Sequence, residues 1–205
     1  MASKFDICSK ALAELGEDAI SSFTANTPPS NACGLIYPDY IKYLLSIFEW
    51  NFTLKKVQLA RLSEAPLNEW KYAYQMPSDM LVFRAFFVGS ETNILPQTNY
   101  EIFQDEVYTN EETVYIDYQF QVDESNFPPY FTEFVVKALS AKLALPITDD
   151  KNILQIKKVE AFGNPSDNLN GGEFAVAKKI DSLQNPSPSF NSNGGGNDLL
   201  AARFS

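Results

Sequence analysis

The sequence contains no histidine. Because histidine is the commonest general base in enzymes, catalysis by a serine–histidine or cysteine–histidine pair is excluded. The two cysteines, Cys8 and Cys33, lack the spacing of a metal site, so we expect small buried thiols in preference to a structural disulfide. No glycine-rich stretch has the spacing of a loop that binds phosphate groups.

Basic residues are few. The chain has 16 lysines and arginines against 26 acids, and its net charge is −10. This balance argues against a protein that coats the phosphates of a nucleic acid, and it suits one that must not adhere to DNA. No apolar run approaches membrane-spanning length, and the acidic N-terminal segment lacks the apolar core of a signal peptide. We therefore expect a protein that is made and folds in a cytoplasm and has no membrane partner.

Helices are predicted near both ends of the chain, where apolar residues recur at intervals of three and four. Ser3 is a helix-capping residue, and the pair Thr27-Pro28 is typical of a second helix start. Pro38 should kink that second helix or break it in two. A third helix should begin at Pro128-Pro129 and stop at Pro146.

Two shorter helices are predicted beyond Pro146. Thr148 should cap the first of them, and residues 163–172 should form a loop. The last helix is expected over residues 173–184, with three apolar side chains facing inward: Phe174, Ala177 and Ile180.

Strands are predicted in the middle of the chain. Residues 80–88 form one, and residues 113–122 alternate so regularly that they predict a half-buried antiparallel strand. The apolar parity includes Phe120 and the polar parity includes Gln119, so Phe120→Asp should disrupt folding and Gln119→Asp should be mild. The segment before this strand, "YEIFQDEVYTN", is expected to pair with it through a turn near residues 110–111.

Two further segments also favour strands. The alternation between Phe52 and Leu59 changes parity, which predicts a bulge or a bend. In "WKYAYQMPSDML", residues 70–81, the alternating aromatics fit a strand face, and Pro77 and Asp79 are typical of a turn. A platform on which a ligand stacks is the less favoured interpretation of these aromatics.

This order of elements predicts an α+β fold: a helical bundle formed by N- and C-terminal helices, with an inserted antiparallel β-rich segment. Residues 1–50 plus 129–184 would form the bundle, and residues 51–128 the insertion. Residues 185–205 differ in composition from the rest and would form a flexible linker and a C-terminal docking tail.

Paired carboxylates are the one catalytic arrangement that the composition leaves open, because glycoside hydrolysis needs only two acids. Four adjacent pairs are present: Asp105-Glu106, Glu111-Glu112, Asp123-Glu124 and Asp149-Asp150. Each lies in a predicted turn or helix start, where acids are common for local reasons. We therefore expect solvated surface positions and no catalytic, cofactor-binding or metal site.

Five segments carry a family resemblance through their order and spacing. They are "ALAELGEDAISSF", "LLSIFEWNF", "WKYAYQMPSD", "YEIFQDEVYTNEETVYIDYQF" and "FPPYFTEFVVKALSAKLALPIT". Together they resemble the tail tubular protein A family, the head-to-tail adaptors of short-tailed bacteriophages, over residues 5–184. The third segment fits the pattern W-x-Y-x-Y-x-[apolar]-P-x-D. Pro38 and the loop 163–172 depart from the family pattern.

The resemblance implies a structural virion protein of the tail and neck, assembled in the host cytoplasm. Copies would form a ring, typically a dodecamer, beneath the portal protein. The ring would extend the DNA channel without sequence-specific binding and dock the tail nozzle or tube protein. The alternative from a different class is a virion-associated glycan hydrolase that uses a carboxylate pair.

The C-terminal tail is the predicted docking element. Residues 185–197 have the composition of a flexible linker. Beyond it lie the predicted interface residues Leu199, Leu200, Arg203 and Phe204. These side chains are too few to form a core, so we expect them to dock onto a neighbouring subunit or the portal; a disordered end is the alternative.

Overall fold

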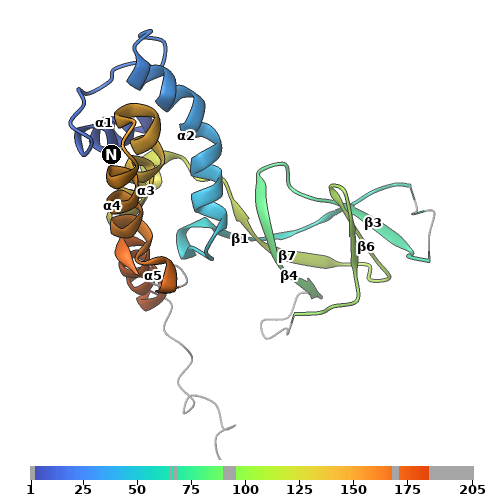
Figure 1. Ribbon diagram of the computed structural model, residues 1–205. Coiled ribbons are helices and arrows are strands. Elements are labelled where there is room, and N and C mark those ends of the chain that lie inside the picture. Colours follow the sequence, from blue (N-terminus) through green and yellow to red (C-terminus); the bar gives the residue numbers. More distant parts are fainter. Residues whose placement is uncertain (1–2, 65, 67–68, 90–95, 168–170, 185–205) are drawn as a thin grey trace, which may run out of the picture.

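The computed structural model describes residues 3–64, 66, 69–89, 96–167 and 171–184. Its five α-helices are α1 (Lys4–Ala13), α2 (Pro28–Ser46), α3 (Pro129–Thr148), α4 (Lys151–Phe162) and α5 (Gly172–Leu183). Its strands are β1 (Leu54–Gln58), β2 (Ala60–Arg61), β3 (Tyr72–Gln75), β4 (Met80–Val88), β5 (Glu101–Phe103), β6 (Glu106–Thr109) and β7 (Val114–Phe120). The helices occupy one side of the molecule and the strands the other (Figure 1). None of the described helices has the length and apolar character needed to cross a bilayer.

The two N-terminal helices begin where the sequence predicts. Ser3 caps α1 in a capping box, because its hydroxyl accepts from the amide of Asp6 while the Asp6 carboxylate accepts from the amide of Ser3. Thr27 caps α2, and the helix then runs through Pro38 without ending. Pro38 is exposed, so the missing hydrogen bond lies on the solvent side of a continuous helix.

The boundary between α3 and α4 differs from the prediction. α3 continues through Pro146 and ends at Asp149, whose φ of 50° lies in the left-handed region. Asp150, and not Thr148, caps α4. The hydroxyl of Thr148 instead donates to the carbonyl of Ala144, at 2.7 Å, within the last turn of α3. Pro146 is exposed, as is Lys142 four residues earlier, so the hydrogen bond that the proline removes lies on an exposed side of the helix.

The last helix was predicted correctly in extent but not in the face that it buries. Phe174 and Ala177 face inward, whereas Ile180 is 39% exposed. Asp181 takes the inward position instead and is 1% exposed. Its carboxylate accepts from the hydroxyl of Tyr130 at 2.6 Å and from the amide of Asn51 at 3.0 Å, so α5 is fixed by hydrogen bonds as well as by apolar contact.

The strands form two antiparallel sheets, in the orders β1-β7-β4 and β2-β3-β6-β5. The predicted pairing of residues 100–110 with the strand at 113–122 is wrong, because β6 pairs with β3 and β5 while β7 pairs with β1 and β4. The parity change after residue 57 is the point where the chain leaves one sheet at β1 and enters the other at β2. The segment 70–81 forms β3 and the turn into β4, as predicted.

Strand β7 has the predicted alternation but not the predicted environment. Val114, Ile116 and Tyr118 are buried in the sheet core, as expected. Gln119, on the opposite parity, is fully buried, whereas Phe120 is only partly buried. Gln119 faces the helices and not solvent, so the environment from which a mild Gln119→Asp was expected is wrong.

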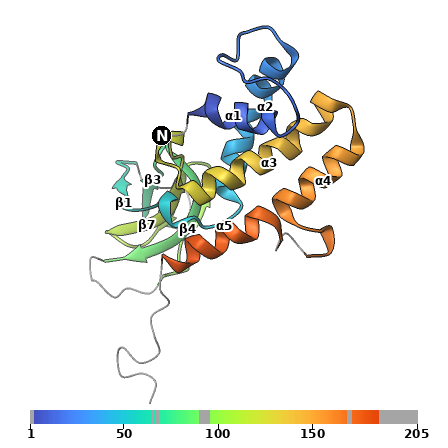
Figure 2. The ribbon, with the colours of Figure 1, turned by 90° about the vertical axis from the view of Figure 1, so that its left-hand side faces the viewer.

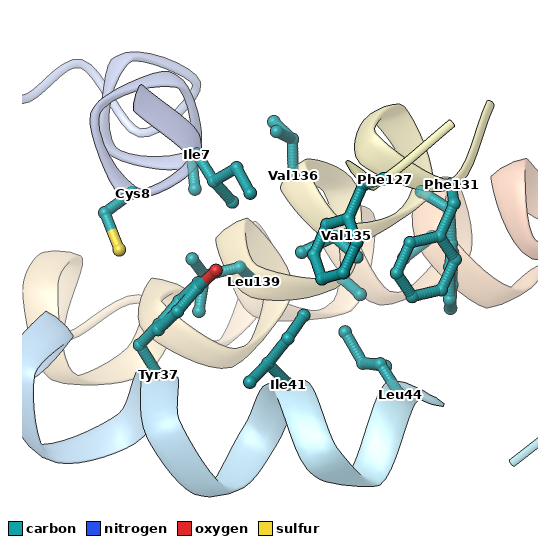
Figure 3. Close-up of a cluster of buried hydrophobic side chains, with 14 of the residues drawn as sticks. Ile7, Cys8, Tyr37, Ile41, Leu44, Phe127, Phe131, Val135, Val136 and Leu139 are labelled. Atoms are coloured by element: carbon teal, nitrogen blue, oxygen red, sulfur yellow. The ribbon is translucent and has the colours of Figure 1, made fainter. Parts of the chain in front are cut away.

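Two buried clusters correspond to the two sides of the molecule. The larger lies among the helices; α3 packs against each of the other four α-helices, and side chains of α1, α2 and α3 meet between them (Figures 2 and 3). Aromatic rings surround Trp50 in this cluster, and the Trp50 ring centroid lies 4.9 Å from that of Phe131. The smaller cluster lies between the two sheets and includes Tyr74, Phe86 and Val107.

The expected architecture, a bundle of N- and C-terminal helices flanking an inserted β segment, is corrected by this structure. The protein is α+β with five described α-helices and two antiparallel sheets, but the strands are central and not an appendage. The physical reason is that the sheets bury a core of their own and also contribute to the helical core. Leu81 and Phe120, for example, pack against the helical cluster.

Candidate functional site

A groove of about 870 Å³ opens between the C-terminal half of α3 and α4. Its volume is within the range of sites that bind ligands or peptide side chains, roughly 300–1,000 Å³. Apolar side chains make most of its wall, together with two lysines and two amides. The lining residues are Tyr40, Ala141, Lys142, Leu145, Pro146, Leu154, Gln155, Lys158, Phe162, Gly163, Asn164 and Pro165.

The turn after α4 closes one end of this groove. Gly163 has φ +79°, and a Cβ atom on it would lie 2.4 Å from the Cα atom of Gly171. Gly172 has φ +60°, and a Cβ atom there would lie 2.5 Å from the carbonyl oxygen of Glu160. Only glycine fits at both positions, so the two ends of the α4–α5 connection touch and hold α5 against α4.

The groove is cationic, although the protein as a whole is acidic. Lys142 and Lys158 are its charged lining residues, and neither forms an ion pair with any residue that the structure describes. The ammonium group of Lys142 lies 5.7 Å from the ring centroid of Tyr40. Burial raises the pKa of Tyr40, and the adjacent Tyr43 adds to this effect, so the phenol stays neutral beside the lysine.

Two other lysines of these helices are neutralised by acids. Lys137 lies 2.6 Å and Lys157 3.3 Å from the carboxylate of Glu14 on α1, and Lys157 also pairs with Glu160 at 2.9 Å. Burial alone would raise the pKa of Glu14, but hydrogen bonds from Lys137 and Ser140 outweigh it and hold that pKa below its usual value. Unlike Lys137 and Lys157, the two lysines in the groove have no acidic partner among the described residues and remain available to a partner.

Neither a comparison with models of known protein families nor one with curated protein sequences finds a match for this chain.

The four candidate carboxylate pairs have local structural roles. Glu124 accepts from the hydroxyl of Tyr37, and Glu112 accepts from that of Tyr72, each at 3.0 Å. Asp105 accepts from the side-chain amide of Gln75 at 2.8 Å, and Asp150 caps α4. The pairs lie at four different turns or helix ends, and none of them lines the groove between α3 and α4.

The remaining reactive groups also have structural surroundings. Cys8 and Cys33 are free, fully buried thiols, as the sequence predicts, on α1 and α2. A hydrogen bond to Cys33, with burial, raises the pKa of Cys8, which makes that thiol a poor nucleophile. Within the described ranges, no three potential metal ligands lie close enough together to hold an ion.

Two further surfaces expose apolar side chains. On α5, Val176, Ile180 and Leu183 are 47%, 39% and 73% exposed and follow one helical face. On the edge strand β5, Ile102 and Phe103 are 44% and 46% exposed. The row on α5 is a continuous apolar stripe, which is typical of an interaction surface. Ile102 and Phe103 point to opposite faces of β5, but an exposed edge strand also offers unpaired backbone groups to a partner.

The predicted interface residues Leu199, Leu200, Arg203 and Phe204 lie outside the described residues, as does the whole docking tail. Sequence reasoning did not find the groove. One signal was present, since Lys142 interrupts the apolar run of α3 three residues before Leu145, which places both on one helical face. That signal does not distinguish a groove from an ordinary solvated side, because the opposite wall belongs to another helix, α4, whose packing angle the pattern does not specify.

Proposed function

We propose that this protein is a head-to-tail adaptor of a short-tailed bacteriophage, a structural subunit and not an enzyme. Copies form a ring beneath the portal protein, extend the DNA channel and dock the tail nozzle or tube protein. Its place is the neck of the virion, and assembly takes place in the host cytoplasm. The order of sequence segments that resembles the tail tubular protein A family is the starting point of this proposal.

The structural observation that carries the proposal is the presence of three separate apolar surfaces on one small chain. These are the groove between α3 and α4, the exposed face of α5 and the edge strand β5. A ring subunit needs at least two surfaces for its neighbours and further ones for the structures above and below it. An isolated monomer has no need of three.

The charge distribution supports the proposed DNA channel. Residues 51–128 contain twelve acidic and five basic side chains, whereas residues 129–184 contain seven of each. An acidic or mixed wall lets DNA slide, because it does not release the counterions of the phosphate backbone. In a mobility shift with duplex DNA at low salt, we expect no complex at micromolar protein; a complex that weakens steeply with salt would reveal a phosphate-binding surface.

Electron microscopy of the full chain mixed with the portal of its phage is the direct test. We expect rings of this protein on one face of the portal. A protein that stays monomeric and does not bind the portal would contradict the proposal. If that monomer also cleaved a polysaccharide, and lost this activity when two acids were changed to amides, the glycan hydrolase would replace the adaptor.

A further inference from the structure

The β5–β6 hairpin presents one exposed aromatic side chain between acids. In its antiparallel register Glu101 lies opposite Tyr108, and Phe103 lies opposite Glu106. Residues opposite each other, and residues two apart, share a face, so these four side chains stand on the same face of the hairpin. Phe103 is 46% exposed, and its ring centroid lies 5.0 Å from that of Tyr108.

The acids of this hairpin have no cationic partner within the described part of the chain. Glu101 accepts from the indole nitrogen of Trp70 at 2.9 Å, and Asp105, in the turn, accepts from the side chain of Gln75. Neither of them, nor Glu106, forms an ion pair there with a lysine or an arginine. The hairpin is therefore an apolar anchor surrounded by uncompensated negative charge.

The groove between α3 and α4 has the complementary character. Leu145, 40% exposed, and Leu154 offer apolar contact, while Lys142 and Lys158 are without acidic partners among the described residues. We propose that the β5–β6 hairpin of one copy docks in this groove of the next copy. Phe103 enters between Leu145 and Leu154, and Glu101 and Glu106 meet Lys142 and Lys158.

The arrangement of the fold makes this contact intermolecular. Figures 1 and 2 place α3 and α4 on the side of the molecule away from the strands that carry the hairpin. The two surfaces differ, so the contact is head-to-tail, and such contacts close into rings when the rotation between copies permits it. A weak single contact then becomes strong in the assembly, because the closed ring repeats it. This inference rests on the proposed ring but specifies its contact.

Charge exchange between the two surfaces tests the contact. One variant of the full chain carries Lys142→Glu and Lys158→Glu, and the other carries Glu101→Lys and Glu106→Lys. Each alone should lose self-association, because like charges then face each other. An equimolar mixture should regain it, since every hairpin then meets a groove of opposite charge. A matched control, Glu17→Lys with Asp18→Lys, reverses two exposed acids that belong neither to the groove lining nor to the hairpin and should associate like the wild type.

Sedimentation at low salt, up to about 1 mM protein, gives the mass of each sample, and thermal melts verify that each variant is folded. Wild-type protein that remains a monomer throughout this range would overturn the contact. Variants that associate as the wild type does, or a mixture that stays monomeric, would also overturn it. If a charge variant does not fold, Phe103→Ala and Leu145→Ser replace the two charge variants, and each should then lose association.

The same variants separate this contact from the proposed function. If both charge variants form rings on the portal with unchanged efficiency, the proposed hairpin contact is wrong and the adaptor role is unaffected. If self-association depends on the two surfaces but the protein does not bind the portal, the contact is supported and the proposed adaptor role is wrong.

Discussion

The helical side and the strand side of this protein are held together by different interactions. Among the helices, aromatic rings contact one another directly, as Trp50 does with Phe131 and Phe134 with Phe174. Between the sheets the large side chains are more often tyrosines, whose hydroxyls are tied to polar groups; Tyr74 donates to the carbonyl of Glu111 at 2.7 Å. The helical core therefore contains more direct ring contacts, although hydrogen bonds such as those of Trp50 and Tyr130 also occur in it. In the sheet core a larger share of the large side chains are tyrosines with hydrogen-bonded hydroxyls.

The contact between the two sides depends on polar groups. The side-chain amide of Gln119, on β7, donates to the carbonyls of Leu45 and Phe48 and to the hydroxyl of Thr53, and its oxygen accepts from Arg84. One buried amide thus connects the end of α2 with Thr53, directly before β1, and with Arg84 on β4. The two sides differ in how they are stabilised, but neither is independent of the other.

The largest effect is expected for Gln119→Leu, which keeps the size of the side chain. It leaves the carbonyls of Leu45 and Phe48 and the Arg84 side chain without this partner in a buried place. We expect the free energy of unfolding of this variant, measured in urea, to be about 3–5 kcal/mol lower than that of the wild type.

The same substitution two residues further on, Gln121→Leu, is the matched control. Gln121 shares the parity of Gln119 but is exposed. The free energy of unfolding of the Gln121→Leu variant should therefore stay within about 0.5 kcal/mol of the wild-type value. Phe120→Asp should lie between the two, because Phe120 is only partly buried and its ring is 4.0 Å from the ammonium of Lys55. Equal stability of the Gln119 and Gln121 variants would show that the two sides meet through apolar contact alone.

The next effect concerns α5. Asp181→Ala removes the acceptor for the Tyr130 hydroxyl and for the amide of Asn51, both partly buried. We expect a loss of about 2–3 kcal/mol in denaturant unfolding. Burial, the hydrogen bond to Asp181 and its charge raise the pKa of Tyr130, so the variant should also lower the pH at which this tyrosine ionises in a spectrophotometric titration.

If Asp181→Ala is as stable as the wild type while the Tyr130 titration moves, then the aromatic contacts of Phe174 suffice to hold α5. If neither quantity changes, the hydrogen bonds to Asp181 are absent in solution.

A smaller, pH-dependent effect distinguishes two ion pairs, one on each side. The pKa of Glu14 is held below its usual value by Lys137 and Ser140 against the effect of burial, and hydrogen bonding to Lys55 lowers the pKa of Asp79. A carboxylate with a lowered pKa in the folded state stabilises the protein above its unfolded pKa. That stability is lost as pH falls through the folded pKa, so melting temperature should decline below about pH 4.

Glu14→Gln and Asp79→Asn should each make this decline shallower. Each removes a pH-dependent contribution to the free energy of unfolding of about 1 kcal/mol or less. Added salt should weaken the Asp79 contribution more, since its side chain is 42% exposed against 19% for Glu14. An equal response of the two variants to salt would show that both pairs are equally open to solvent.

The smallest effect on the isolated chain is expected from deletion of residues 198–205. If this tail docks on a neighbour or the portal, the melting temperature of the monomer should stay nearly unchanged while assembly on the portal is impaired. A truncated protein that assembles normally would contradict the docking role. A monomer that loses several degrees would indicate a tail that packs on its own core.

Local interactions explain why some of these elements could be predicted from sequence. The caps of α1 and α2 depend on residues within four positions of each other, and the alternation of β7 depends on neighbours along one strand. The groove was not predictable in the same way, because Lys142 on α3 and Lys158 on α4 become one site only after the two helices pack. Its closed end depends on a contact between Gly163 and Gly171 that no short pattern specifies.

The sequence by itself determined the starts of α1, α2 and α3, the strand at 80–88, most of the strand predicted at 113–122, and the turn between β3 and β4. Each depends on hydrogen bonds and backbone angles set by adjacent residues. Only the tertiary structure decided that β7 pairs with β1 and β4 and not with β6, and that Gln119 is buried. The alternation of apolar and polar residues indicates that a strand has two different faces, but it does not indicate which distant element covers each face. That choice is made by long-range packing, in which helix α2 supplies the carbonyls that satisfy a buried amide.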